Sequence, residues 1–489
     1  MEATPRDEPF AVLHETHSAV VLLCGDRAYK MKKPVVTDFL DFGSLERREH
    51  ACARELELNR RLAPDAYLGV GRLTDPSGGP GEPVLVMRRM PGAARLSAVL
   101  AGPGATGNTL SALVGMLTRF HDGARRGPEI DRAATADAVR ARWAALLRGL
   151  TDPPVPAERA HRIDRLATRY LDGRTTLFDS RIATHRIVDG HGDLHAGDIY
   201  VLPDGFRVLD CLDFDDELRH VDRLDDIAFL AMDLEFLGHP DLADSLMDQY
   251  VTATADPAPS SLRHHYLAYR ATVRAKVNCI RHRQGAPDAA EHATRHLDLA
   301  IHHLTAGAVR MALVGGLPGT GKSTVAQALA HRTGATVLST DHIRAGQRTQ
   351  GTLTGASGAY SRGAYSPQAR AQVYAALRAE ARALLEGGHS VVLDASWTDA
   401  DERRRVTNLA TGTAADMIEL CCTAPLSVTS SRIAARSGGE SEATPAIASA
   451  MAADRAPWDS ALPLDTTQPL TETIHTAMRA WQRSSDHTP

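Results

Sequence analysis

This sequence has few cysteines, no long apolar runs and no excess of positive charge. Its 489 residues include only 6 cysteines, and none of them stands in a C-x-x-C pair. This excludes a disulfide scaffold, disfavours a zinc or redox motif and fits reduced thiols in a cytoplasm. No stretch approaches the run of about 18 apolar residues that spans a membrane, and the acidic N-terminus lacks the apolar segment of a signal peptide. The sequence therefore predicts a cytoplasmic protein without a membrane segment.

The charge balance also disfavours one class of partner. Lys and Arg total 55 and Asp and Glu total 60, which gives a formal net charge of −5. Such a surface does not attract nucleic acid by charge alone. Hydrophobic residues make up 43% and charged residues 24% of the chain, as in ordinary globular proteins. At about 150 residues per domain, the length predicts two or three domains, and there are no internal repeats.

The first 300 residues predict a small β-rich lobe followed by a larger helical lobe. Apolar runs favour strands at 19–24 and 82–90, with a helix over 44–62 that Ser44 can cap. A Pro-Asp-Gly turn between two short apolar runs predicts a hairpin within 199–214, embedded in the helical lobe.

Near residue 306 the pattern changes to alternating strands and helices. Strands are predicted at 309–314, 336–339, 390–393 and 416–421, with a helix at 371–386. Such alternation implies a parallel sheet covered on both faces. The predicted fold class is thus an α+β bilobal domain over 1–305, with its small lobe at about 1–92 and its helical lobe at about 93–305, followed by an α/β P-loop domain over 306–489.

Residues 316–323 read GLPGTGKS, which is the full G-x-x-x-x-G-K-[ST] pattern between a predicted strand and a predicted helix. Glycines allow the backbone N–H groups of such a loop to face phosphate oxygens, and the helix N-terminus adds positive partial charge. Lys322 would reach the β- and γ-phosphates, and the Ser323 hydroxyl would ligate Mg²⁺. The predicted nucleotide-binding residues of this loop are Gly316, Gly319, Thr320, Gly321, Lys322, Ser323 and Thr324.

Charged residues elsewhere in this half suggest phosphoryl transfer to an acceptor. Asp341 ends the second predicted strand and could take a proton from an acceptor hydroxyl, and Arg344 could grip the acceptor. Asp394 ends the strand VVLD, where an acid that organises Mg²⁺ would lie. Arg432 and Arg436 are spaced like lid arginines, although solvated helix charges are an equal alternative. Over about 309–470 the pattern resembles small P-loop kinases of the gluconate kinase, polynucleotide kinase and zeta-toxin kind.

The first half contains a second acidic motif, HGDLHAGD, at 191–198. Kinase catalytic loops place an Asp beside the acceptor hydroxyl and a metal ligand five positions later. Asp193 is the candidate base, Asp198 falls at the metal position, and Asp213 of the following LDFD cluster is the second candidate metal ligand. Asp210 competes with Asp213 for this role. His191 and His195 are interpreted as scaffolding of the loop.

These motifs, with the helix that begins at Asp225-Asp226, resemble the aminoglycoside phosphotransferase and choline kinase branch of the kinase-like fold. The resemblance covers about 10–300 and implies ATP-dependent phosphorylation of a small-molecule hydroxyl. It implies that Lys30, or else Lys32, holds the α- and β-phosphates, and that Glu55 orients that lysine, with Glu49 as a weaker candidate. Residues 85–90 would form the hinge against adenine. The chain departs from the family at Asp198, where the family has Asn.

The two halves together resemble a bacterial fusion of an aminoglycoside phosphotransferase-like domain with an AAA-family ATP-binding domain. The resemblance implies ATP and Mg²⁺ at two sites. Three hypotheses follow: a kinase for a sugar, aminocyclitol or antibiotic-like hydroxyl; a 5′-hydroxyl kinase for nucleotides or nucleic acid in the second half; or a pair in which one half senses ATP to regulate the other. The net charge of −5 disfavours the second hypothesis, and Asp198 makes the first half the better candidate for a passive partner.

Overall fold

The computed structural model describes residues 9–483 except 17, 37–40, 75, 103–106, 151–154, 354–365 and 436–443. The chain divides into two compact units. The first consists of residues 1–160, 179–258 and 266–300, and the second of 161–178, 259–265 and 301–489. The second unit thus includes segments that precede the predicted boundary between residues 305 and 306, and that boundary stays a prediction.

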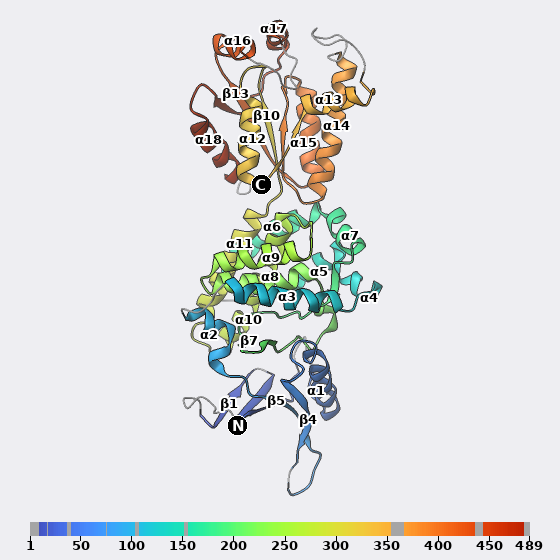
Figure 1. Cartoon of the computed structure of the whole chain (residues 1–489), viewed down its shortest axis with the longest axis vertical. Coiled ribbons are helices and arrows are strands. Elements are labelled where there is room, and N and C mark those ends of the chain that lie inside the picture. The colour runs from blue at the N-terminus through green and yellow to red at the C-terminus, as the bar shows by residue number, and fades with distance from the viewer. Residues whose placement is uncertain are drawn as a thin grey trace. The chain divides into compact units, whose positions relative to one another are not determined.

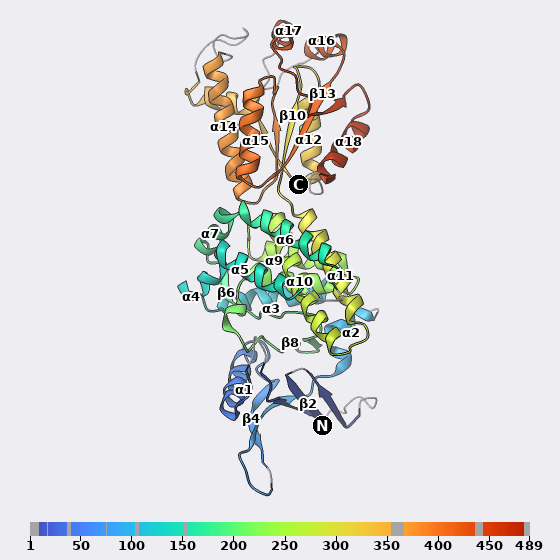
Figure 2. The same ribbon diagram turned by 180° about the vertical axis from the view of Figure 1, so that it is seen from behind.

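An antiparallel sheet and one helix form the start of the first unit. The strands lie in the order β1-β2-β3-β5-β4, with bounds Ala11–Glu15, Ala19–Cys24, Arg27–Lys32, Tyr67–Leu73 and Glu82–Arg88 for β1 to β5. Helix α1 (Leu45–Asn59) joins β3 to β4 and packs on β4 and β5 (Figure 2). Ser44 caps α1, because its hydroxyl accepts the N–H of Arg47 at 3.3 Å. The sequence analysis missed the two edge strands, β1 and β4.

Helices make up most of the remainder of the first unit. The helices that begin there are α2 (Leu96–Ala101), α3 (Gly107–Gly123), α4 (Pro128–Asp131), α5 (Ala136–Arg148), α8 (Arg223–Phe236) and α9 (Pro240–Ala253). Four more span the division between the units: α6 (Ala157–Asp172), α7 (Thr175–Ala183), α10 (Ser260–Arg283) and α11 (Ala289–Ala306). The predicted hairpin is β7 (Ile199–Leu202) with β8 (Gly205–Val208), and β6 (Ile187–Asp189) pairs with β9 (His220–Asp222). Helix α8 is buried from Arg223 to Leu234.

A fully parallel sheet forms the centre of the second unit. Its order is β11-β12-β10-β13-β14, with β10 at Arg310–Gly315, β11 at Thr336–Ser339, β12 at Val391–Asp394, β13 at Asp416–Thr423 and β14 at Leu462–Asp465. Four of these strands were predicted, whereas β14 was not. The predicted fold class, an antiparallel kinase-like lobe with helices and then an α/β P-loop domain, is confirmed.

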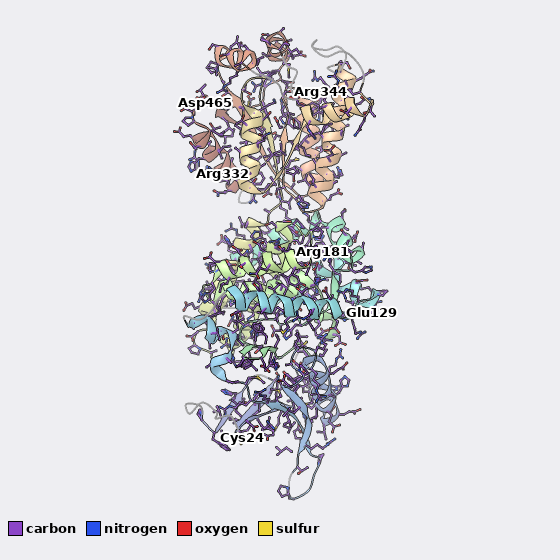
Figure 3. All side chains as sticks on the ribbon, in the orientation of Figure 1. Cys24, Glu129, Arg181, Arg332, Arg344 and Asp465 are labelled. Atoms are coloured by element: carbon purple, nitrogen blue, oxygen red, sulfur yellow. The ribbon has the colours of Figure 1, made fainter. Side chains whose placement is uncertain are left out.

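Helices cover both faces of the parallel sheet (Figure 1). Helices α12 (Lys322–Thr333) and α18 (Leu470–Arg483) lie on one face, and α14 (Pro367–Glu386) and α15 (Ala400–Gly412) on the other. The remaining helices are α13 (Thr340–Thr349), α16 (Leu426–Ala434) and α17 (Pro445–Ala453). In Figure 3, Arg344 and Asp465 lie toward the end of the sheet where the strands terminate, and Arg332 lies toward the opposite end.

The earlier segments of the second unit pack against the N-terminal end of β13. Arg169 of α6 pairs with Asp416, with 2.7 Å between nitrogen and oxygen, and the buried Arg174 donates to the carbonyl of Thr413 at 2.8 Å. A Cβ atom on Gly173 would lie 2.0 Å from that carbonyl oxygen, so the close approach requires glycine. These contacts make residues 161–178 part of the second unit. Among the described residues, no helix has the length and apolar character needed to cross a membrane.

Candidate active sites

A lysine pair lies at the centre of the first unit's candidate site. The Lys30 ammonium contacts Glu55 at 2.8 Å and Asp210 at 2.5 Å. Burial opposes the charge of Lys30, but Asp210 and Glu55 raise its pKa well above the ordinary value. The Lys30 charge in turn holds the pKa of Asp210 at about 2. Glu49 instead pairs with Arg72, so it is Glu55 that the fold brings to the lysine strand.

Lys32, two residues along β3, contacts the other oxygen of Glu55 at 2.7 Å and Asp213 at 2.6 Å. The structure therefore brings both predicted lysines to one glutamate. It also brings both candidate metal-binding carboxylates, Asp210 and Asp213, into the same ionic network.

The HGDLHAGD segment places three ionisable side chains together. His195 Nε2 lies 3.0 Å from a carboxylate oxygen of Asp198 and 3.9 Å from one of Asp193. Burial would lower the pKa of His195, but the charge and hydrogen bond of Asp198, assisted by Asp193, raise it to about 9. His195 thus contacts the predicted metal ligand Asp198 and lies near the predicted base Asp193, while its Nδ1 atom accepts the backbone N–H of Gly197 at 3.1 Å. The sequence analysis interpreted it only as scaffolding.

Two carboxylates of helix α8 hydrogen-bond the backbone of this candidate catalytic loop. Asp226 accepts the backbone N–H groups of His191 at 2.7 Å and Gly192 at 2.9 Å, and Asp233, two turns later, accepts that of Ala196 at 2.8 Å. The ring of His191 is buried, and burial lowers its pKa, which fits a structural role. Asp233 was missed because nothing in the sequence distinguishes it from a solvated helix residue.

The backbone also connects Asp210 to the catalytic loop. The Leu209 N–H donates to the Asp198 carbonyl at 2.9 Å, and the Leu212 N–H donates to the His191 carbonyl at 3.1 Å. Asp210 itself has φ +61°, a left-handed conformation that non-glycine residues adopt mainly where the surrounding structure imposes it. The segment after β8 is therefore fixed against the loop that contains Asp193.

In the second unit, the loop between β10 and α12 has the backbone that a phosphate cradle requires. Gly316, Gly319 and Gly321 have φ of +144°, +82° and +84°. A Cβ on Gly316 would lie 2.7 Å from the Cys422 carbonyl oxygen, and one on Gly319 would lie 2.5 Å from that of Thr429. Only glycine fits at these two positions. Ser323 and Thr324 are exposed on the first turn of α12.

A lysine and a carboxylate face each other beside this loop. Lys322 Nζ lies 3.9 Å from Asp394 Oδ1, and Ser323 hydrogen-bonds the same carboxylate. Burial raises the pKa of Asp394 against the effects of Lys322 and Ser323. Its Oδ1 atom is buried and has no hydrogen-bond partner within the described part of the chain. An oxygen ligand at the end of β12 is therefore available to a cation.

The two residues predicted to act on the acceptor in the second unit form an ion pair. Asp341 and Arg344, one turn apart at the start of α13, make an ion pair of 2.6 Å. Arg432 donates to the Thr466 carbonyl at 2.8 Å and approaches the Gly319 carbonyl at 3.5 Å, so it lies against the phosphate loop. Arg436 lies outside the described residues.

Sequence reasoning missed two features near this loop. Trp397 is fully buried yet has φ +51°, and such a conformation in a bulky residue is a true outlier. Thr466 donates from its hydroxyl to the Thr320 carbonyl at 2.6 Å, which ties the chain after β14 to the loop. The strand VVLD was singled out for Asp394, and a left-handed conformation of the tryptophan three residues later cannot be predicted from the sequence.

Metal-ligand clusters of three or more His, Cys, Asp or Glu side chains are absent from the residues that the structure describes.

The comparisons with known proteins agree with the predicted class for the second half. Residues 311–458 match the family model described as an AAA domain, so this half is a P-loop domain of that family. The chain is also 47% identical, over 479 residues, to uncharacterized proteins of Mycobacterium tuberculosis and Mycobacterium bovis, with 97% of this chain and 96% of each relative covered. The chain therefore belongs to the same family as these mycobacterial proteins, a fusion of a kinase-like unit with a P-loop unit.

Solved structures similar to this chain include kinases for each half. A choline/ethanolamine kinase family protein from Mesorhizobium loti is 15% identical and covers 60% of this chain and 93% of its own, with a TM-score of 0.36. The Mycobacterium tuberculosis APS kinase, in complex with AMPPNP and APS, is 21% identical and covers 36% and 98%, with a TM-score of 0.28. A gluconokinase from Sinorhizobium meliloti is 18% identical and covers 36% and 94%, with a TM-score of 0.28. At these scores none of the likenesses assigns a function.

Proposed function

We propose that this protein is an ATP-dependent phosphotransferase that phosphorylates a hydroxyl group of a small molecule, with one MgATP site in each unit. The observation that supports this best is in the second unit. There, a buried oxygen of Asp394 lacks a hydrogen-bond partner among the described residues and lies 3.9 Å from Lys322, beside a loop whose glycines leave its backbone open to phosphate. A buried carboxylate oxygen without a hydrogen bond is costly, and a cation bound at this position would remove much of that cost.

In the second unit, Lys322 would stabilise the charge on the β- and γ-phosphates, and the backbone N–H groups of the loop would bind their oxygens. Ser323 and Asp394 would hold Mg²⁺, which supplies charge neutralisation at the transferred phosphoryl group. Asp341 would take the proton of the acceptor hydroxyl. Arg344, which contacts Asp341, would orient that carboxylate and grip the acceptor.

In the first unit, Asp193 would orient and deprotonate the acceptor hydroxyl, and Lys30, held by Glu55, would bind the α- and β-phosphates. Asp198 would supply one metal-binding carboxylate. For the second we favour Asp210 over Asp213. The Asp210 side chain is 52% exposed, whereas that of Asp213 is 12% exposed and is held by Lys32. This changes the assignment favoured by sequence, in which Asp213 was the ligand and Asp210 the alternative.

One observation favours a second candidate, in which the first unit senses ATP and does not transfer phosphate. The carboxylates of Asp193 and Asp198 both lie beside His195, where a kinase with Asn in place of Asp198 would have one negative charge fewer. Such a unit would bind nucleotide and regulate the other site without consuming ATP.

The experiment is a screen of ATP consumption against sugars, aminocyclitols and nucleosides, read as ADP release. It uses the full chain, Asp193→Asn, Lys322→Ala and the double variant. A kinase with two sites loses part of its acceptor-dependent ADP release in each single variant and all of it in the double variant. If the double variant keeps the full rate, the proposal is wrong. If Asp193→Asn keeps the full rate of ADP release while the first unit still binds MgATP, the hypothesis that the first unit is an ATP sensor is correct.

A further inference from the structure

Strand β3 presents two lysines to one face, whereas the proposed mechanism uses only one. Lys30 and Lys32 are two residues apart, so their side chains point to the same side of the strand. Each takes a different oxygen of Glu55. Each also pairs with a different aspartate after β8, Lys30 with Asp210 and Lys32 with Asp213. The result is a continuous chain of five charged groups: Asp210, Lys30, Glu55, Lys32 and Asp213.

The two ends of this chain differ in their access to solvent. The Asp210 side chain is 52% exposed, and the Lys30 side chain is 14% exposed. At the other end, the side chains of Lys32 and Asp213 are 5% and 12% exposed, and the Lys32 ammonium lies 5.1 Å from the centre of the buried Phe42 ring. The Asp210 carboxylate is therefore the more exposed of the two, whereas Asp213 lies beside Phe42 at the edge of a cavity.

The buried end connects three separate parts of the lobe. Lys32 belongs to β3, Glu55 to α1 and Asp213 to the segment after β8, and Phe42 precedes α1. If Lys32 were removed, Asp213 would be left largely buried without its cation and Glu55 would keep only Lys30, which is costly in a low-dielectric interior. Lys32 thus fixes α1 and the Asp210–Asp213 segment relative to the strand that contains Lys30.

From this geometry we infer that Lys32 is a positioning residue. It holds Glu55 and Asp213 so that Lys30 and Asp210 face MgATP, and Asp213 is its anchor and not a ligand of the metal. The inference deepens the proposed function of the first unit and depends on it. Lys32 itself does not touch the nucleotide.

The test uses the full chain with Lys322→Ala, which silences the second site, and measures binding of Mg·AMPPNP, the kinetics of ATP turnover and the dependence of turnover on free Mg²⁺. We expect Lys30→Met and Asp210→Asn to lose nearly all turnover and Asp210→Asn to require at least tenfold more Mg²⁺. Asp213→Asn should keep the Mg²⁺ requirement within about threefold. Lys32→Met should lower kcat/KM by about 10- to 100-fold, the range expected when catalytic groups are displaced.

Two further variants separate positioning from a general loss of stability. Lys32→Arg, which keeps a cation between the two carboxylates, should recover most of the turnover, and adding Asp213→Asn to Lys32→Met should recover at least threefold by removing one unpaired charge. The matched control is Lys33→Met, because the neighbouring Lys33 instead contacts Glu15 and the Thr16 carbonyl. It should stay within twofold of the parent.

The outcomes distinguish this inference from the proposed function. If Asp213→Asn raises the Mg²⁺ requirement tenfold and worsens Lys32→Met, Asp213 is a metal ligand and the inference is wrong. If Lys32→Met lowers the melting temperature but leaves kcat/KM unchanged, Lys32 is merely structural and the inference is also wrong. If the Lys322→Ala chain binds no Mg·AMPPNP at all, the first unit has no nucleotide site and the proposed function fails together with the inference.

Discussion

The two candidate sites handle charge in opposite ways. In the first unit, the Asp210 carboxylate of the proposed site pairs with Lys30 at 2.5 Å, and Asp198 contacts His195 at 3.0 Å. In the second unit, Lys322 stays 3.9 Å from Asp394, and an oxygen of Asp394 has no hydrogen-bond partner within the described ranges. The first site thus holds these carboxylates in close contacts, whereas the second holds its cation at a longer distance and leaves one buried oxygen without a hydrogen bond.

From this difference we expect the two sites to rearrange to different extents when MgATP binds. Ion pairs in the first unit have to exchange partners when phosphate and metal arrive, because Lys30 cannot serve both Asp210 and a phosphate equally. The second site presents backbone N–H groups, which need no rearrangement because glycine conformations fix them. We therefore expect the first site to depend on individual side chains more strongly than the second.

The largest effect is expected at the proposed base of the first unit. Asp193→Asn should lower acceptor-dependent phosphoryl transfer by the first unit by about two to four orders of magnitude, because general base catalysis contributes about that much. Rates of ADP release in the Lys322→Ala background measure it. Asp204→Asn is the matched control. It makes the same chemical change nearby in the chain, but Asp204 pairs with Arg207 in the hairpin and not with a residue of the proposed site. An unchanged rate for Asp193→Asn would show that Asp193 does not act as a base in the first unit. The comparison of two catalytic sites would then be wrong.

The second site should lose somewhat less from a single change. Lys322→Ala should lower transfer by the second unit by about two to three orders of magnitude, because it removes one preorganised charge while the backbone donors remain. Transfer by the first unit should continue if the sites are independent. ADP release in the Asp193→Asn background measures the loss, and Arg332→Ala is the control, because Arg332 lies at the far end of α12 (Figure 3). Loss of all activity in Lys322→Ala alone would show that the two sites are coupled.

The parts that sequence predicted are those with local signals. The GLPGTGKS loop, Ser44 as a helix cap and four of the five parallel strands follow from glycine chemistry, capping and apolar runs of a few residues. Strand β14 was missed because LPLD is short, and β1 and β4 because edge strands have exposed, mixed faces. The sequence favoured Asp213 over Asp210 as the metal ligand, but both follow the same hairpin and no local signal separates them. The assignment depends on which lysine of β3 contacts which carboxylate, and these contacts are set by the tertiary structure.

The two units can also be compared in how much their ion pairs away from the sites stabilise the fold. In the first unit, buried Arg181 contacts Asp222 at 2.6 Å and also pairs with buried Asp256, among the helices where Figure 3 labels it. Arg181→Met should lower the free energy of unfolding by about 3–5 kcal/mol, because two buried carboxylates lose their cation. Chemical denaturation measures it. Arg404→Met, at an exposed pair with Asp401 in the second unit, should cost at most about 0.5 kcal/mol. Equal losses would mean that buried ions do not distinguish the first unit.

The smallest effect is expected from acid, and it should act on the first unit. His296 is buried and stacks on Phe236 with 3.7 Å between ring centres, and its Nδ1 atom hydrogen-bonds the His292 carbonyl at 2.7 Å. Burial lowers the pKa of His296 to about 4. The unfolded chain, with an ordinary pKa near 6.5, therefore binds a proton between pH 6.5 and 4 that the folded chain does not bind.

Stability from His296 is then complete above about pH 6.5 and falls as the pH drops toward 4. The loss should reach roughly 1–3 kcal/mol, since each pKa unit corresponds to about 1.4 kcal/mol. His296→Phe keeps an aromatic ring on Phe236 and removes the titrating group, so its free energy of unfolding should decline less over this pH range. The central cluster of the parallel sheet in the second unit is apolar, so its unfolding should shift less with acid. Parallel curves for the wild type and His296→Phe would assign the acid sensitivity to other buried groups of the first unit.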